Sequence, residues 1–191
     1  MAEPKKEEYK VVQRVPFWLA VALTVVISIP FGVFLGPYNI ALWSSFIVWA
    51  EYFVFGATYK ALKYIYTLFP LGALWGAISA TLIDYFVIYL HSNLVLNVVV
   101  WLFIWVAVMV YIMKYHENFT KYSLAYFNGL SMYLAFYFAH IGPGMGGGPL
   151  ISNPLIDPWI LWVWCYLSAI LGGFLGWLNV QLTFPKKVRV S

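Results

Sequence analysis

Charged residues are scarce in this chain. Only 9% of its 191 residues are Asp, Glu, Lys or Arg, whereas 63% are hydrophobic. A soluble domain ordinarily carries about 25% charged residues, so this chain has too few polar groups to cover a surface in water. The composition therefore predicts an integral membrane protein surrounded by a lipid bilayer. The Lys and Arg residues lie in short clusters between apolar runs, which is typical of a topology signal and not of a nucleic-acid-binding surface.

Residues that ligate metals or act as nucleophiles are scarce too. The single cysteine, Cys165, lies in an apolar run, so neither an intrachain disulfide nor a metal–thiolate cluster is available. The chain has three histidines, and neither an HExxH nor a GxSxG pattern occurs. The sequence thus gives an enzyme little support, and it indicates no catalytic residue, cofactor or metal.

Six apolar segments are each long enough to approach the roughly 20 residues that cross a bilayer core. They lie at 16–36, 39–57, 66–90, 94–113, 119–141 and 159–184. We expect an all-α bundle of six transmembrane helices over 16–184, with a charged tail at 1–15 and a short basic tail at 185–191. Residues with side chains that favour a helix N-cap precede several segments, among them Asn39, Asn93, Asn118 and Asp157.

The basic residues fix the expected orientation. All 11 Lys and Arg residues lie before the first segment, after the sixth, or beside the second-to-third and fourth-to-fifth connections. Six spans place all of them on one face of the membrane, whereas five or seven spans would scatter them. Because cytoplasmic loops carry the excess of Lys and Arg, both termini are expected in the cytoplasm, in the plasma or inner membrane.

Small residues recur every fourth position in two of the segments, at Gly72, Gly76 and Ala80, and again at Gly172 and Gly176. Four-residue spacing places such residues on one helix face. A face of glycine and alanine lets two helix backbones approach closely in lipid. We therefore expect these five residues to be helix-packing positions.

Two carboxyl groups and one imidazole lie within or at the end of the apolar segments, those of Asp84, Glu51 and His140. A carboxyl in hydrocarbon costs roughly 2.5–3.5 kcal/mol on insertion scales, so Asp84 and Glu51 are expected to face protein or a polar cavity. One interpretation is a polar pathway for a small solute or protons, with His140 as a relay. The alternative is that both carboxyls are hydrogen-bonded to neighbouring helices and serve assembly.

Two further patterns leave alternatives open. The stretch 142–149, GPGMGGGP, is either a re-entrant loop beside a cavity or a plain outer connection. Tyr52-Phe53 resembles Tyr137-Phe138, and the glycines of the third segment resemble those of the sixth. Two three-span halves have opposite topology, so the chain is a candidate for an inverted repeat, although apolar sequences also match by chance.

These motifs resemble a known family. Tyr52-Phe53 ahead of Gly56, the small-residue run 72–81, and the sequence from Gly172 to Trp177 are similar to the family of small prokaryotic membrane proteins called domain of unknown function 1097, DUF1097. The resemblance covers about residues 20–183. It implies a multi-pass inner-membrane protein, and it transfers no catalytic or binding residue.

Two functions of different classes remain open. The first is a transporter or channel for a small solute, with proton coupling as an option and Asp84, Glu51 and His140 along its route. The second is a non-catalytic structural or accessory subunit, whose glycine–alanine faces dock a membrane-complex partner or a second copy. Transport predicts a polar cavity that connects Asp84 with Glu51 or His140. An accessory subunit predicts a closed interior and an outward-facing stripe of small residues.

Overall fold

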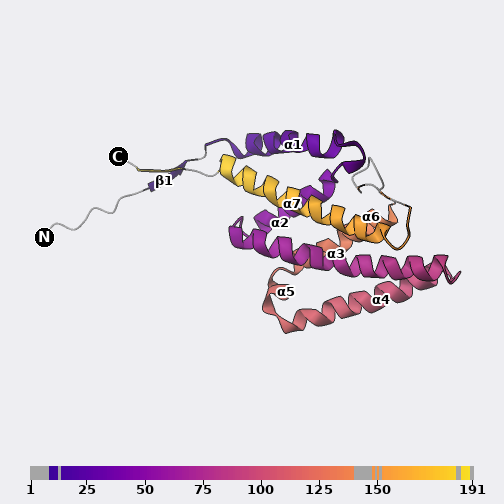
Figure 1. Cartoon of the computed structure of the whole chain (residues 1–191). Coiled ribbons are helices and arrows are strands. Elements are labelled where there is room, and N and C mark those ends of the chain that lie inside the picture. The colour runs from indigo at the N-terminus through magenta and orange to yellow at the C-terminus, as the bar shows by residue number, and fades with distance from the viewer. Residues whose placement is uncertain are drawn as a thin grey trace.

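The computed structural model describes residues 9–12, 14–139, 148, 150, 152–183 and 186–189. These residues are mainly α-helical (Figure 1). The helices are α1 Phe17–Val33, α2 Leu42–Val54, α3 Tyr59–Ile88, α4 Leu94–Ile112, α5 Glu117–Lys121, α6 Ser123–Phe138 and α7 Asp157–Thr183, with short 3-10 turns η1 Gly36–Tyr38 and η2 Met113–Tyr115. Two short strands, β1 Tyr9–Val12 and β2 Lys186–Arg189, pair antiparallel.

Each expected segment contains a helix, but the helices differ in length. By length and composition, three are long and apolar enough to cross a membrane: α3, α4 continued through η2, and α7. By contrast, α2 has 13 residues, about 20 Å at 1.5 Å per residue, and α6 has 16. The third segment begins earlier than expected, at Tyr59, and the fifth is divided by Tyr122 into α5 and α6. The described residues therefore contain three helices that are candidates for membrane spans.

The caps explain some of these boundaries. Asn93 caps α4 as predicted, because its side chain accepts a hydrogen bond from the backbone of Leu96 at 3.0 Å. Two predicted caps were wrong. The Asn39 side chain accepts from a backbone N–H four residues earlier and α2 begins only at Leu42, while His116 and not Asn118 caps α5.

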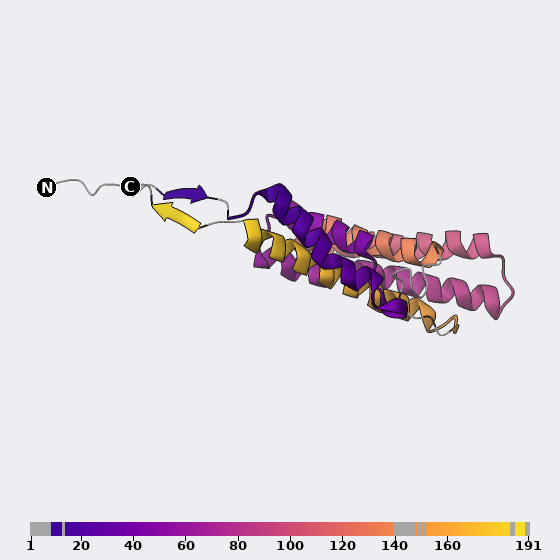
Figure 2. The ribbon, with the colours of Figure 1, turned by 90° about the horizontal axis from the view of Figure 1, so that it is seen from above.

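The two longest helices, α3 and α7, form the centre of the bundle and run antiparallel (Figure 1). Helix α3 packs against α6, α4 and α7, while α7 packs against α2 and α1. Strands β1 and β2 extend beyond the helices, so the chain enters α1 and leaves α7 at the same end (Figure 2). We call this end the sheet end, and the opposite one, where α3 and α6 end and α7 begins, the far end.

Glycines bring the central helices into close contact. A Cβ atom built at Gly72 would lie 1.8 Å from the backbone oxygen of Tyr126 on α6, and one at Gly172 would lie 2.2 Å from that of Ser45 on α2. Ala80 is also buried. The small-residue faces therefore point into the bundle, and no outward-facing stripe is formed by them.

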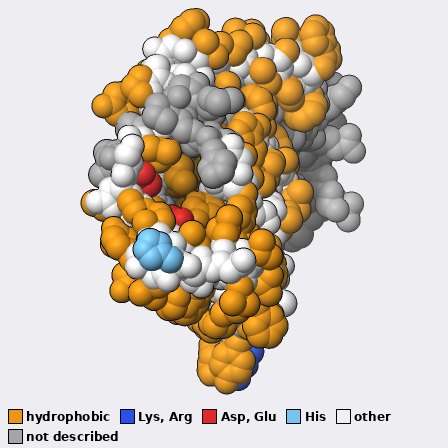
Figure 3. Space-filling model, turned by 90° about the vertical axis from the view of Figure 1, so that its right-hand side faces the viewer, with side chains coloured by type: hydrophobic (Ala, Val, Ile, Leu, Met, Phe, Trp, Pro, Cys, Tyr) orange, Lys and Arg blue, Asp and Glu red, His pale blue; other side chains and the backbone are white. Residues whose placement is uncertain are grey.

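The outside of the bundle is strongly apolar. Helix α4 contributes large exposed side chains such as Val95, Val99 and Phe103, the last of them 75% exposed. Exposed apolar side chains extend over most of the described surface at the far end (Figure 3). Soluble monomers rarely expose contiguous apolar surface on this scale, so the structure agrees with a membrane protein.

Candidate functional site

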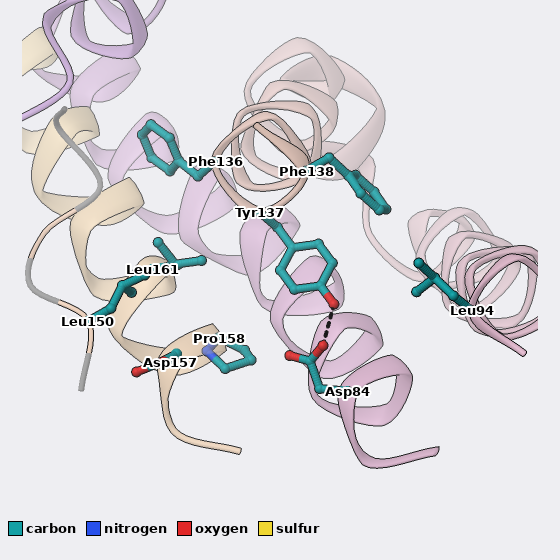
Figure 4. A pocket seen from close by; sticks show the side chains of 9 residues that line it. All are labelled: Asp84, Leu94, Phe136, Tyr137, Phe138, Leu150, Asp157, Pro158 and Leu161. Carbon is teal, nitrogen blue, oxygen red and sulfur yellow. Dashed lines mark hydrogen bonds between the residues drawn. The ribbon is translucent and has the colours of Figure 1, made fainter. Parts of the chain in front are cut away.

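A cavity of about 320 Å³ opens at the far end of the bundle. It lies among the last turns of α3 and α6 and the first turns of α7. Its described lining residues are Asp84, Leu94, Phe136, Tyr137, Phe138, Leu150, Asp157, Pro158 and Leu161 (Figure 4). Figure 3 looks onto this end and shows acidic side chains inside a hollow with a mainly apolar rim. The cavity thus combines an apolar wall with two carboxyl groups.

Asp84 lines the cavity from the face of α3 that carries the predicted packing positions Gly76 and Ala80. It lies four residues after Ala80 and eight after Gly76, so α3 presents it on the side that meets α6. There the Tyr137 hydroxyl donates a hydrogen bond of 2.6 Å to Asp84 Oδ1 (Figure 4). This length is typical of a strong bond from a hydroxyl to a carboxylate, and it fixes the carboxyl at the cavity wall.

Asp157 supplies the second carboxyl. It is the first residue of α7 and is followed by Pro158, whose fixed backbone suits the first turn of a helix. An acidic side chain is stabilised at this end of a helix because the exposed backbone N–H groups carry partial positive charge. No Lys or Arg occurs among the described lining residues, so the described wall bears acidic groups alone.

A buried tyrosine connects α6 to the start of α7 next to this cavity. The Tyr133 hydroxyl donates to the backbone oxygen of Pro158 at 2.9 Å, and its side chain has no exposed surface. Its ring fits against α3 because residue 76 is glycine; a Cβ there would lie 2.4 Å from the ring. Since Tyr133 is one helical turn before Tyr137, it lies on the sheet-end side of the cavity.

Glu51 lies apart from the cavity. It is on α2, near the sheet end, and is 2% exposed. Asn128 on α6 donates its amide to Glu51 Oε1 at 2.5 Å. The other carboxyl oxygen, Oε2, has no hydrogen-bond partner among the described residues. Burial of a carboxyl with one oxygen that lacks a partner among the described residues is costly, so the hydrogen bond from Asn128 is the contact that stabilises this carboxyl in the described interior.

The structure therefore separates the residues of the expected pathway. Asp84 lines the cavity and Glu51 does not, while His140 and most of 142–149 lie outside the described residues. Sequence reasoning missed Tyr137 as the partner of Asp84 and treated Asp157 only as a cap. The spacing of Tyr133 and Tyr137, four residues apart on one face of α6, was the available signal.

Replacing Tyr137 with phenylalanine removes the donor to Asp84 and keeps the ring. We expect the free energy of unfolding in mixed micelles to fall by about 1 kcal/mol, because the net value of such a bond is of this size. Tyr89→Phe is the control, since that ring is 52% exposed at the end of α3. Equal stability of the two variants would show that the bond to Asp84 contributes nothing measurable.

The described residues contain no group of three or more His, Cys, Asp or Glu side chains arranged to hold a metal ion. The family model for a protein of unknown function, DUF1097, matches residues 18–183. The chain belongs to the DUF1097 family. No curated protein and no solved structure matched it. Membership of the DUF1097 family assigns no activity, so the function of this member has to be argued from its cavity and its apolar exterior.

Proposed function

We propose that this DUF1097 protein is a small-solute transporter or channel with six transmembrane helices, and that the far-end cavity is the outer part of its route. The observation that carries the proposal is the acid-lined cavity at one end of a bundle whose exterior is apolar. Ligand sites in proteins are typically concave, mostly apolar and fitted with a few convergent polar groups. A lipid-facing exterior gives such a cavity access from only one side of the membrane.

The positions of the basic residues support the orientation. Those in the described parts of the chain lie in the strands, in the connection from β1 to α1, or in the helix turns nearest the sheet end: Lys10, Arg14, Lys60, Lys63, Lys114, Lys121, Lys186, Lys187 and Arg189. An excess of Lys and Arg marks the cytoplasmic face. We propose that the sheet end and both termini are cytoplasmic, and that the cavity opens on the other side of the cell membrane.

Reporters fused to either terminus test this orientation. We expect a reporter that is active only in the cytoplasm to function at both ends of the chain. A reporter that requires export should be inactive at both ends and become active when it is inserted after Leu90, at the far end. An exported signal from either terminus would contradict the six-span arrangement.

The interior favours transport over the accessory-subunit alternative. The faces containing Gly72 and Gly172 are covered by α6 and α2 of the same chain, so they are not available to dock a partner. The described cavity does not reach Glu51. The route is accordingly closed on the sheet-end side in this state, where Tyr133 joins α6 to α7. We propose that Glu51, with Asn128, exchanges a proton when the route opens, which would couple transport to protons.

Flux through proteoliposomes tests the proposal. We expect the wild type to pass at least one member of a panel of small solutes or protons faster than empty liposomes do. Asp84→Asn should lower that flux at least about tenfold, because it removes a carboxyl group from the cavity wall and alters the Tyr137 contact. Glu117→Gln, a change in α5 outside the cavity, should leave it unchanged. Absence of flux across the whole panel would refute transport.

A further inference from the structure

The two central helices repeat the same burial pattern. Nine of the buried positions of α3 recur as buried positions one hundred residues later in α7. The pairs are Ala61/Leu161, Ile65/Cys165, Leu68/Ser168, Phe69/Ala169, Gly72/Gly172, Ala73/Gly173, Gly76/Gly176, Ser79/Asn179 and Ile83/Thr183. Any two amphipathic helices can be aligned by their common period, so this agreement needs support from contacts.

The short helices repeat in the same way. Five buried positions of α2 recur 81 residues later in α6. The pairs are Ser44/Ala125, Ser45/Tyr126, Val48/Gly129, Trp49/Leu130 and Tyr52/Tyr133. The weak sequence match paired Tyr52 with Tyr137, which is one helical turn away from this alignment. Glu51 breaks the pattern, because its counterpart Met132 is only partly buried.

The contacts between the helices agree with both alignments. Gly72 meets the backbone oxygen of Tyr126, and Gly172 meets that of Ser45. Tyr126 and Ser45 are themselves counterparts. Backbone-to-backbone approach at a glycine fixes how two helices cross. The pair α3–α6 therefore crosses at the same residues as the pair α7–α2.

One turn further along, the next pair of glycines is matched as well. A Cβ at Gly76 would meet the ring of Tyr133, and one at Gly176 would meet the ring of Tyr52, at 2.4 and 2.7 Å. Tyr133 and Tyr52 are also counterparts. Because this second pair of contacts has the same register as the first, the agreement between the two helix pairs does not depend on one glycine alone.

The hydroxyls of these two tyrosines donate hydrogen bonds to equivalent parts of the backbone. Tyr133 donates to the backbone oxygen of Pro158 at the start of α7, at 2.9 Å. Tyr52 donates to the backbone oxygen of Ala57, just before α3, at 2.8 Å. The two acceptors are equivalent to within one residue. In each half, a tyrosine from a short helix thus holds the start of the following long helix.

Backbone oxygens of the two long helices complete the correspondence. Pro70 on α3 accepts from Trp162 Nε1 at 2.9 Å, and its counterpart Ile170 on α7 accepts from the Tyr66 hydroxyl at 3.1 Å. Each long helix therefore receives, at an equivalent carbonyl, an aromatic donor from the other one.

We infer that the chain consists of two inverted repeats, α1–α3 and α4–α7, and that a second cavity, the counterpart of the one at the far end, opens at the sheet end in another state. The counterparts of Phe136, Pro158 and Leu161 are Phe55, Thr58 and Ala61. These three residues line the second cavity. Halves with the same fold and opposite orientation can exchange conformations at similar free energy, which is the basis of alternating access in transporters with inverted repeats.

The position at the sheet end that is equivalent to the far-end cavity is closed in the present structure. Ala61 has no exposed surface. Beside it, the ring of Tyr122 stacks on Tyr64 with centroids 4.2 Å apart and meets the edge of Phe55 at 5.0 Å. The far-end counterpart of Tyr64 is Trp164, whose ring is 6.2 Å from Tyr38. In the present structure the far-end cavity is open and its counterpart at the sheet end is closed. In the exchanged state, the far-end cavity would be closed and its counterpart open. The role of this exchange in carrying a solute rests on the proposed function.

Thiol labelling tests the second cavity. In a Cys165→Ala background, Ala61→Cys in proteoliposomes is exposed to a charged, membrane-impermeant methanethiosulfonate. We expect labelling from the sheet-end side, because Ala61 becomes accessible when the second cavity opens. The matched control is Ala77→Cys, which is equally buried on α3 but whose counterpart lies outside the far-end cavity. It should stay unlabelled.

A wedge in the far-end cavity makes the test specific. Adding Leu161→Trp should hold the far end open and lower the labelling rate of Ala61→Cys at least about fivefold, since it shifts the population between the two states. Leu90→Trp, at a residue 54% exposed outside the cavity, should not. No labelling of Ala61→Cys, or labelling that ignores the wedge, overturns the inference.

A second cysteine variant and a comparison of labelling with flux separate the second cavity from the proposed transport. If Ala61→Cys does not give a monodisperse protein, the same wedge comparison is made with Phe55→Cys, and the same criterion applies. Wedge-sensitive labelling without flux would leave the second cavity standing and remove the transport of the tested solutes. Flux with no labelling at Ala61 would leave a transport route and remove the second cavity.

Discussion

Gly72→Ala is expected to lower the free energy of unfolding by about 3 kcal/mol, because the new methyl group has to push α6 away from α3. The built Cβ lies 1.8 Å from the Tyr126 backbone oxygen, and a backbone atom cannot rotate aside as a side chain can. Gly172→Ala, its counterpart against Ser45, is expected to have a similar effect. Unfolding in mixed detergent micelles, followed by circular dichroism, measures both.

Gly32→Ala is the matched control for these two variants. It also adds a methyl group inside a helix, but the methyl group meets only the side chain of Leu42, which can change rotamer. We expect it to cost less than half as much. If all three variants lose the same stability, the crossings at Gly72 and Gly172 do not fix the packing of the bundle.

Removing the partner of Glu51 is the second large effect that we expect. The Glu51 side chain is 2% exposed, and Asn128 donates the hydrogen bond to its Oε1. Asn128→Leu removes this bond, so that Oε1 loses its partner as well as Oε2. The cost should be about 2 kcal/mol, as for other buried polar groups that lose their partner. Adding Glu51→Leu to this variant should restore stability to within about 1 kcal/mol of the wild type, because no polar group is then left unsatisfied.

The same pair of variants separates stability from function. The double variant is expected to be folded and, under the proposed proton exchange, to have lost proton-coupled flux. If the single and double variants are equally unstable, the bond between Asn128 and Glu51 is not what stabilises this part of the interior. If the double variant keeps its proton dependence, Glu51 is not the coupling group.

The sequence predicted those helices whose signals are local. Helix α4 is a continuous apolar run with a good cap at Asn93, and both ends were placed within about one residue. The short helices were overestimated, because an apolar composition continues beyond the point where α2 and α6 stop. Their ends depend on packing against α7 and α3. The pairing of β1 with β2 was missed, since it joins segments at opposite ends of the chain.

The candidate site was predictable in part for a similar reason. Asp84 could be selected because a carboxyl in an apolar segment is costly wherever the helices are placed. Its partner Tyr137 lies 53 residues away, and the partner of Glu51 lies 77 residues away. No local pattern specifies such contacts between helices. The inverted repeat that we infer has only two short matches in the sequence, because the two halves agree in burial and in contacts more than in residue type.

One measurement tests the central claim, that solute passes through the far-end cavity. Leu161→Cys in a Cys165→Ala background places a thiol on the cavity wall. Flux is recorded in the same proteoliposomes before and after complete reaction with a bulky methanethiosulfonate added on the far-end side. We expect flux to fall to the level of empty liposomes. Undiminished flux, with modification at residue 161 confirmed by mass spectrometry, would contradict it.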